Sequence, residues 1–223
     1  MTERPVIYGY GASTYTRMVL VAADEKGIDY SFQAVASWDG YKKDPEFLDL
    51  HPFRKVPVLE HRGARITETL AILNYLEREF DDRSLVPSGA LDIARMWELI
   101  STTIQYAWPV WVPILTTHRL FNPMAGDPVD EDLVAKRLPD MLYAAKVIGK
   151  LVTMRGETFD LADIVLAGTF KYVTETPECK SILEASSELA EWWDRTSARS
   201  SIASHMPDTD WAARTAEMAA PVG

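Results

Sequence analysis

The first 35 residues restrict the possible folds most, because they carry the pattern of a strand, a turn, a helix and a second strand. Residues 5–8 form a short apolar run with β-branched side chains, which suits a buried strand. A turn of small residues follows, in which Ser13 or Thr14 can cap a helix that should stop at residues 26–27 (Lys-Gly). Residues 28–35 have the composition of a second strand. Two strands joined by a crossover helix form a right-handed unit with a parallel strand pair.

Residues 56–76 predict a hairpin followed by a helix. The first five suit a strand with Pro57 near its start, where the missing N–H group is tolerated. A turn at residues 62–63 (Arg-Gly) leads to a short second strand. Apolar side chains then recur with helical spacing, at positions 70, 72, 73 and 76. The N-terminal region is therefore expected to be an α/β domain with the element order βαβ-ββα.

The remainder of the chain has helical periodicity and no strand alternation. Pro109 and Pro113 should make the first helix bend, break or end near them, and the Pro- and Gly-rich residues 122–130 predict a loop. Asp160 and Asp163 have the spacing of a capping box at a helix start. The predicted helical segments are 90–118, 130–154, 160–175, 178–184 and 187–199.

An acidic segment that also carries Pro and Gly separates these two patterns. We therefore predict three parts: an α/β domain at residues 1–80, a linker at 81–89, and an all-helical domain at 90–223.

The net charge and the cysteine content exclude several classes of protein. A formal charge of -10 argues against nucleic acid as the main partner, because binding phosphates needs clustered Lys and Arg. Cys179 is the only cysteine, so neither a disulfide scaffold nor a cysteine-rich zinc site can form, and we predict no metal site. The sequence shows neither a signal peptide at its start nor an apolar stretch of the ~18 residues needed to span a membrane. We expect a cytoplasmic protein.

Three motifs in fixed order carry a resemblance to a known family. Residues 8–17 (YGYGASTYTR) contain the pattern Ala-Ser-x-x-Thr-Arg, residues 51–58 read HPFRKVPV, and Glu68-Thr69 opens a helix. This set resembles the glutathione transferases, in particular the serine-type phi and theta/delta classes. Within it His51 stands where Asn is common, Arg54 where Gly is common, and threonine where serine usually follows the acid. The resemblance implies a thioredoxin-like domain that binds glutathione, followed by an all-helical domain with an apolar substrate pocket.

Ser13 is the candidate catalytic residue. The thiol of glutathione must ionise to attack, and a free Cys thiol has a pKa of ~8.5. A hydroxyl at a helix N-terminus can donate to a sulfur anion, and the helix dipole adds to the favourable field. A serine that only caps the helix is the alternative. Other classes of the family use a tyrosine near this position, so Tyr8 and Tyr10 are rival candidates.

The resemblance also implies how glutathione is held. Pro57 matches a cis-proline, which would let the Val56 backbone pair with the peptide-like middle of glutathione as an added strand does. Thr69 would bind the γ-glutamyl carboxylate at a helix N-terminus, and Glu68 would bind the γ-glutamyl ammonium. The basic side chains expected to reach the glycyl carboxylate are Lys42 and Lys55.

Aromatic side chains supply the expected electrophile pocket, with core packing or dimer contact as the alternative for each. The candidates are Tyr10, Tyr106, Trp108 and Trp111. We predict an enzyme of detoxification, a homodimer by analogy with the family, that conjugates glutathione to small apolar electrophiles. The alternatives are another glutathione-dependent reaction on the same fold, such as a peroxidase, isomerase, dehalogenase or ether-cleaving reaction, or a non-catalytic glutathione-binding protein.

Overall fold

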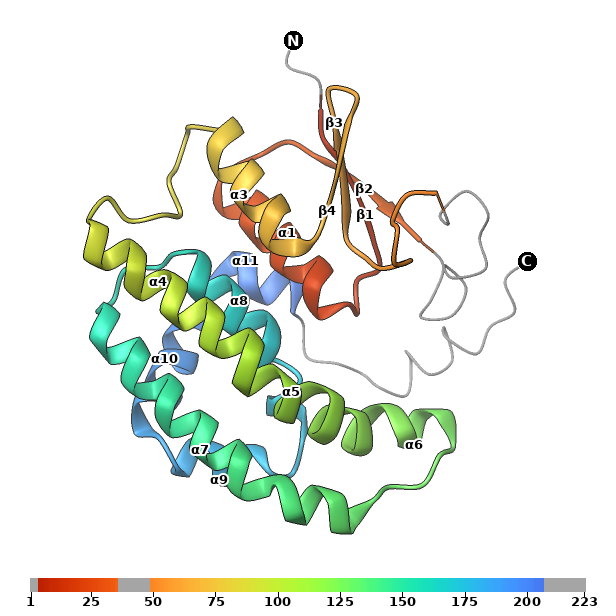
Figure 1. Ribbon diagram of the computed structural model, residues 1–223, viewed down its shortest axis with the longest axis vertical. Coiled ribbons are helices and arrows are strands. Elements are labelled where there is room, and N and C mark those ends of the chain that lie inside the picture. The colour runs from red at the N-terminus through yellow and green to blue at the C-terminus, as the bar shows by residue number, and fades with distance from the viewer. Residues whose placement is uncertain (1–3, 36–48, 207–223) are drawn as a thin grey trace. The chain divides into compact units, whose positions relative to one another are not determined.

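A computed structural model describes residues 4–35 and 49–206 of the 223-residue chain. It divides into two compact units, with the boundary between Leu85 and Val86. The N-terminal unit combines a sheet with helices and the C-terminal unit is helical, so the predicted fold class is confirmed (Figure 1).

The N-terminal unit is built on a four-stranded mixed sheet with the order β2-β1-β3-β4. The strands β1 and β2 are parallel, as the crossover predicts, whereas β3 pairs antiparallel with both β1 and β4. The register places Tyr8 opposite Val58, and Val58 opposite Thr67. The strands are β1 (Val6–Gly9), β2 (Ser31–Ala34), β3 (Val58–His61) and β4 (Ala64–Thr67).

Two helices, α1 (Thr14–Glu25) and α3 (Thr69–Glu79), pack against each other and against the sheet (Figure 1). Their buried side chains follow the helical spacing expected from the sequence, and the sheet contributes the buried Ile7 and Leu59. Helix α1 starts after an N-cap at Ser13 and ends before Gly27, whose φ of 66° is open to glycine. Both ends of this helix were predicted from residue type.

The β3–β4 hairpin turns at Arg62 and Gly63, which have φ values of 50° and 71°. Two consecutive residues with positive φ match the right-handed twist of the two strands they connect. The predicted hairpin is therefore confirmed, with Arg62 held in a conformation unusual for a side-chain-bearing residue.

The C-terminal unit is a bundle in which α8 (Leu161–Phe170) is buried along its whole length. Long helices α4 (Ala90–Thr102) and α7 (Glu131–Arg155) pack against each other, and α10 (Ser187–Ser197) packs against α7 (Figure 1). The shorter elements are the 3₁₀ turn η3 (Val173–Glu175), α9 (Cys179–Glu184) and α11 (Ser200–His205).

The two prolines do not end the helical path, which continues from α4 to residue 125. It passes through a π-helical segment η1 (Thr103–Ala107), a short α5 (Trp108–Val110), a second π segment η2 (Trp111–Phe121) and α6 (Asn122–Ala125). Proline has no N–H to donate to the helical hydrogen-bond ladder. In the wider π turns the neighbouring N–H groups bond to carbonyls five residues back, so the helical path can continue past the prolines. The loop expected at 122–130 is therefore shorter, beginning at Gly126, and α11 extends beyond the last helix that we predicted.

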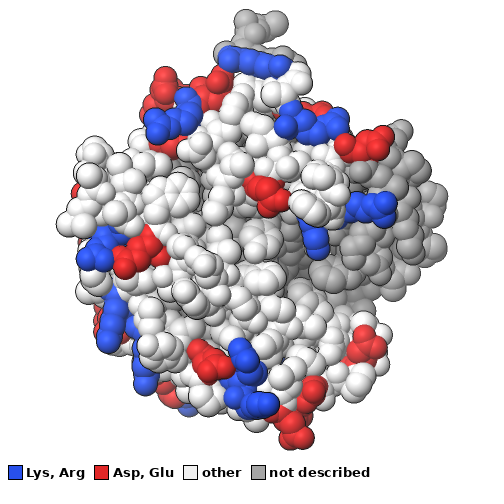
Figure 2. All heavy atoms as spheres, in the orientation of Figure 1, with Lys and Arg blue, Asp and Glu red and all other residues white. Residues whose placement is uncertain are grey.

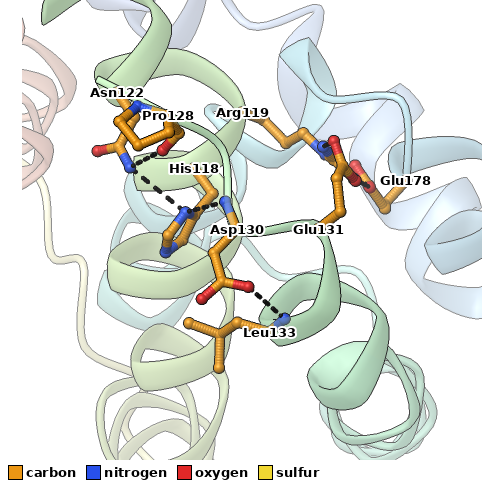
Figure 3. Close-up of polar contacts among 8 residues, drawn as sticks. All are labelled: His118, Arg119, Asn122, Pro128, Asp130, Glu131, Leu133 and Glu178. Atoms are coloured by element: carbon orange, nitrogen blue, oxygen red, sulfur yellow. Dashed lines mark hydrogen bonds and ion pairs between the residues drawn. The ribbon is translucent and has the colours of Figure 1, made fainter.

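Hydrogen bonds and ion pairs from the end of η2 hold the short loop after α6 (Figure 3). His118 Nδ1 accepts the backbone N–H of Asp130 at 3.1 Å, and the Asp130 carboxylate accepts the N–H of Leu133 as the N-cap of α7. Arg119 donates to Glu131 and to Glu178 from its two sides, at 2.7 Å each. These contacts fix the start of α7 against η2.

At the start of α8 the predicted capping box is present. The Asp160 carboxylate accepts the N–H of Ala162 at 2.7 Å, and Asp163 accepts the N–H of Asp160 at 2.9 Å. Asp163 also binds Arg155 at 2.9 Å and accepts the indole N–H of Trp192 at 2.7 Å. Both carboxylates are paired within the core of the bundle, although Arg155 Nε is buried without a hydrogen-bond partner among the described residues, so the motif serves the core.

The described surface shows mixed charge. On the face drawn in Figure 2, Lys and Arg side chains mostly lie beside Asp and Glu instead of gathering into one basic patch. None of the helices in the described ranges combines the length and hydropathy required to cross a membrane.

Candidate active site

The register of the sheet brings three chain segments to one end. Because Tyr8, Val58 and Thr67 lie in one row across the strands, β1 and β4 end where β3 begins. Helices α1 and α3 therefore both start at this end of the sheet, beside the segment that leads into β3 (Figure 1). All the candidate residues of the N-terminal unit that the structure describes lie on these three segments.

Ser13 is the N-cap of α1. Its backbone is extended (φ -70°, ψ 122°), and its hydroxyl oxygen accepts the N–H of Thr16 at 3.2 Å. A serine hydroxyl carries one donor and two acceptor sites, so the cap uses one acceptor and leaves the proton available. Capping and donation to a ligand are therefore compatible roles for the same side chain.

The turn before Ser13 is tightly packed. A Cβ atom at Gly9 would lie 2.5 Å from Thr16 Cγ2, which explains why a glycine ends β1. Arg17, which is almost fully buried, donates from Nε to the carbonyl of Gly11 at 2.6 Å. Side chains of the first turn of α1 thus hold the loop that carries Ser13.

Tyr8 is already committed to another partner. Its hydroxyl donates to Glu60 at 2.8 Å, and Glu60 also binds Arg65 at 2.7 Å. The hydrogen bond to Glu60 and partial burial raise the pKa of Tyr8. A phenol that donates to a carboxylate and is harder to ionise is a poor thiol activator. The other rival, Tyr10, is half-buried and packs against Val58.

The segment that leads into β3 contains a cis peptide bond between Val56 and Pro57, as expected. A turn precedes it, in which the N–H of Arg54 donates to the carbonyl of His51 at 2.9 Å and Arg54 has φ 52°. His51 Nδ1 accepts the N–H of Phe53 at 3.0 Å within the same turn. This turn fixes the approach of the chain to Val56.

Glu68 has an unusual backbone for a non-glycine residue, with φ 70° and ψ 119° at the start of α3. Its side chain is 70% exposed, whereas Thr69 is 7% exposed. Strained conformations of this kind persist where the surrounding structure enforces them, and they cluster at ligand sites. The Glu68 carboxylate is thus presented to solvent beside the free N–H groups of a helix start.

Electrostatic contacts link the three segments. Burial, with the nearby Glu68 charge as a second cause, raises the pKa of Tyr15 on α1 to about 12. Burial lowers the pKa of His51, the Glu68 charge opposes this shift, and the Lys55 charge adds to it. Lys55 is exposed, and Lys42 lies outside the described residues. The structure therefore brings together Ser13, Lys55, Val56, Pro57, Glu68 and Thr69 at one end of the sheet.

The aromatic candidates of the C-terminal unit differ in exposure. Tyr106 is 68% exposed and Trp108 is half-buried, so both side chains reach the surface of their unit. Trp111 is fully buried, donates its indole N–H to the carbonyl of Met141 at 3.3 Å and meets Phe170 edge-on. The expectation that Trp111 lines a substrate pocket is wrong, because its ring is part of the bundle core.

The single cysteine is not activated. Cys179 is half-buried, and burial together with the Glu175 charge raises its pKa. Within the described residues no group of three or more His, Cys, Asp or Glu is placed to hold a metal ion.

Two residues of the site were not selected from the sequence. His51 stood out only as a histidine where the family commonly has Asn, and Tyr15 carried no signal at all. Both lie near the Glu68 charge, which is distant from them in sequence, and a local motif does not reveal that proximity.

Comparison with known proteins identifies the family. A sequence model of the glutathione S-transferase N-terminal domain matches residues 12–79. The glutathione S-transferase PM239X14 of Arabidopsis thaliana is 30% identical over 196 residues, covering 84% of this chain and 88% of that relative. The chain belongs to the glutathione S-transferase family.

Solved structures of this family share the fold. Glutathione transferase F7 from Populus trichocarpa matches with a TM-score of 0.81 and 22% identity, covering 92% of this chain and 100% of that one. A glutathione S-transferase-I bound to lactoylglutathione matches with a TM-score of 0.81 and 24% identity, covering 91% and 98%. The sequence resemblance to glutathione transferases is thereby confirmed.

Proposed function

We propose that this protein is a glutathione S-transferase that conjugates the glutathione thiolate to small apolar electrophiles. The observation that carries the proposal is the position of the Ser13 hydroxyl, at the start of α1 and at the same end of the sheet as Val56-Pro57 and Glu68-Thr69. The relatives named glutathione S-transferase, and the fold neighbour bound to lactoylglutathione, support this assignment.

Ser13 would act on the ionisation of the thiol. Its free hydroxyl proton donates to the thiolate, and the N-terminus of α1 adds a positive field. Lowering the thiol pKa by about 2 units corresponds to roughly 3 kcal/mol of preference for the ionised form. A hydrogen bond to a charged group together with a helix terminus is of the right size to supply this preference.

The remaining residues of this end would hold the tripeptide. The Val56 backbone, turned by the cis bond to Pro57, pairs with the peptide groups of glutathione. Thr69 and the start of α3 receive the γ-glutamyl carboxylate, and the exposed Glu68 carboxylate receives the neighbouring ammonium. Lys55 and Lys42 are the proposed partners of the glycyl carboxylate.

The finer parts of the proposal concern the second substrate and the assembly. Tyr10, Tyr106 and Trp108 are proposed contacts of the electrophile, each because its side chain is not fully buried within its own unit. We extend the proposal to a cytoplasmic homodimer with a role in detoxification. Residues 1–80 would form the glutathione-binding domain and residues 90–223 the helical substrate domain, joined by a linker at 81–89.

The thiol pKa of bound glutathione tests the proposal. It can be followed by the ultraviolet absorbance of the thiolate as a function of pH, alongside conjugation of chlorodinitrobenzene. Ser13→Ala should return the pKa of the bound thiol toward ~8.5 and, through the smaller thiolate fraction, lower the conjugation rate at neutral pH by about 25-fold. Ser13→Thr, which keeps the hydroxyl, is the matched control. An unshifted thiol pKa in the wild type, or equal rates for the wild type and Ser13→Ala, would contradict the role of Ser13.

A further inference from the structure

We infer that His51 is a positioning residue that orients the Glu68 carboxylate toward the γ-glutamyl ammonium of glutathione. The inference rests on the proposed function and deepens it, because it assigns part of the affinity for one end of the substrate to a buried side chain that does not itself touch it. The observation behind it is the pair of contacts made by the two imidazole nitrogens.

The hydrogen bond at Nδ1 fixes the protonation state of the ring. Nδ1 accepts the N–H of Phe53 at 3.0 Å, so it must carry a lone pair and not a proton. The imidazole is therefore neutral, with its only N–H on Nε2. Burial of His51, which is 2% exposed, favours the same neutral form.

The N–H on Nε2 points the other way. Nε2 lies 3.8 Å from Oε1 of Glu68, beyond hydrogen-bond length but close enough for the N–H dipole to attract the carboxylate. The Glu68 side chain is 70% exposed, so His51 approaches it from the protein and leaves its outer side to a ligand. The His51 side chain is 2% exposed, so it offers a fixed partner near an otherwise exposed and rotatable carboxylate.

One ring thus links two parts of the site. Through Nδ1 it closes the turn that leads to Val56, and through Nε2 it faces the acid at the start of α3. Asparagine could make the first contact but has no atom at the position of Nε2. A histidine where the family commonly has Asn therefore adds the second contact and keeps the first.

The variant His51→Asn tests this difference directly. Its amide oxygen takes the place of Nδ1, so the turn should form, while the contact with Glu68 is lost. We expect the Kd for glutathione, measured by titration calorimetry, to rise about 2- to 3-fold, less than the loss of a full hydrogen bond, because the contact is long. The conjugation rate at saturating glutathione should stay within about twofold, so KM changes and kcat does not.

A glutathione analogue that lacks the α-amino group of its γ-glutamyl residue separates positioning from general damage. Because Glu68 has no ammonium to bind in this analogue, wild type and His51→Asn should bind it equally. The matched control variant is His118→Asn, whose Nδ1 accepts a backbone N–H in the same way but in the C-terminal unit. It should leave the Kd for glutathione unchanged.

The outcomes distinguish the two proposals. If the wild type does not bind glutathione, the proposed function fails, and this inference fails with it. If the wild type binds but His51→Asn binds both ligands as the wild type does, or loses affinity for both equally, only the positioning role is overturned. Should the variant not fold, nitrogen NMR of the unmodified protein decides. A proton on Nε2, with a resonance that shifts with glutathione and less with the analogue, supports the role, whereas a proton on Nδ1 refutes it.

Discussion

The starts of α1 and α8 are both capped by a polar side chain, but they differ in how many of their polar groups are already bonded. At α8, Asp160 and Asp163 bind backbone N–H groups, Arg155 and the indole of Trp192, and all are buried. At α1, Ser13 accepts a single N–H from Thr16 and keeps its proton. A capping side chain is therefore fully engaged within the core in one unit and keeps a donor available in the other.

The second contrast between these regions is backbone strain. Arg54 and Glu68 have positive φ values close to the candidate site, whereas in the described part of the C-terminal unit positive φ is confined to Gly126 and Gly156. Strained conformations cluster at ligand sites, so Arg54 and Glu68 support the proposed role of this end of the sheet. Arg62 also has positive φ, but it belongs to the hairpin turn at the opposite end of the sheet.

The largest effect is expected where the cap is fully bonded. Asp163→Ala leaves buried Arg155 and the Trp192 indole without their partner, so the free energy of unfolding should fall by about 3–5 kcal/mol. Chemical denaturation measures this loss. Asp140→Ala is the matched control, since it breaks an exposed ion pair with Arg137 and should cost less than about 0.5 kcal/mol. Equal losses for the two variants would mean that the α8 cap is not a core element.

The packing of the turn at α1 gives the next effect. In Gly9→Ala the new Cβ would meet the Thr16 side chain at 2.5 Å, which should lower the free energy of unfolding by about 1–3 kcal/mol and displace Ser13. Conjugation activity should fall with it. The double variant Gly9→Ala/Thr16→Ala removes the two closest contacts and leaves Thr16 Cβ, at 3.1 Å. Partial recovery of activity in it, relative to Gly9→Ala alone, is the outcome that this explanation requires.

Glu68→Gly should separate stability from binding. Glycine adopts φ 70° without strain, so we expect the free energy of unfolding to rise by about 0.5–1 kcal/mol. The Kd for glutathione should rise about tenfold, because the carboxylate is lost. In Glu68→Ala the affinity should fall equally with no gain in stability. A Glu68→Gly protein that binds glutathione normally would remove Glu68 from the site.

The smallest effect concerns Tyr8. Tyr8→Phe should leave conjugation unchanged and lower the free energy of unfolding at pH 7 by about 1 kcal/mol, the worth of the hydrogen bond to Glu60. That hydrogen bond is the main cause of the lowered pKa of Glu60. Because the pKa of Glu60 is lower in the folded than in the unfolded protein, its ionisation stabilises the folded state at pH values above the unfolded pKa of 4.5. This stabilisation is lost as the pH falls through the pKa of the folded state. The difference between the two proteins should therefore shrink below pH 4.5. A large loss of activity would restore Tyr8 as a catalyst.

Much of the N-terminal unit could be predicted from residue type. Several features that depend only on neighbouring residues were found where the sequence predicted them. They are the N-cap at Ser13, the turn at Arg62 and Gly63, and the spacing of apolar residues in α3. The positive φ of Glu68 could not be predicted, because glutamate has no preference for that conformation and the surrounding fold imposes it. The contact from His51 joins residues of different segments and is equally invisible to a local pattern.

In the helical unit, the sequence predicted fewer of the details correctly. The capping box at Asp160 was predicted, and Pro109 and Pro113 were expected to bend, break or end the helix, but the sequence did not show that π-helical segments would carry the helical path through them. Proline removes one hydrogen bond, but the sequence does not state whether the neighbouring turns can widen to accommodate it. Within η2 the Thr116 hydroxyl donates to the carbonyl of Trp111 at 2.8 Å, which supplies a side-chain hydrogen bond to the backbone of this wide segment. Trp111 was misassigned to a pocket for a related reason, as aromatic residues serve cores and pockets alike.

Under the proposed function, the state of Cys179 has a consequence for the stability of the enzyme toward its electrophiles. A catalyst of this kind meets reactive carbon centres throughout its working life, and any thiolate of its own would be consumed by them. Here the one sulfhydryl of the chain is half-buried and held in its protonated form, so the glutathione sulfur is the better nucleophile. Under the proposed function, the protein's own thiol would therefore compete poorly with glutathione for the electrophile.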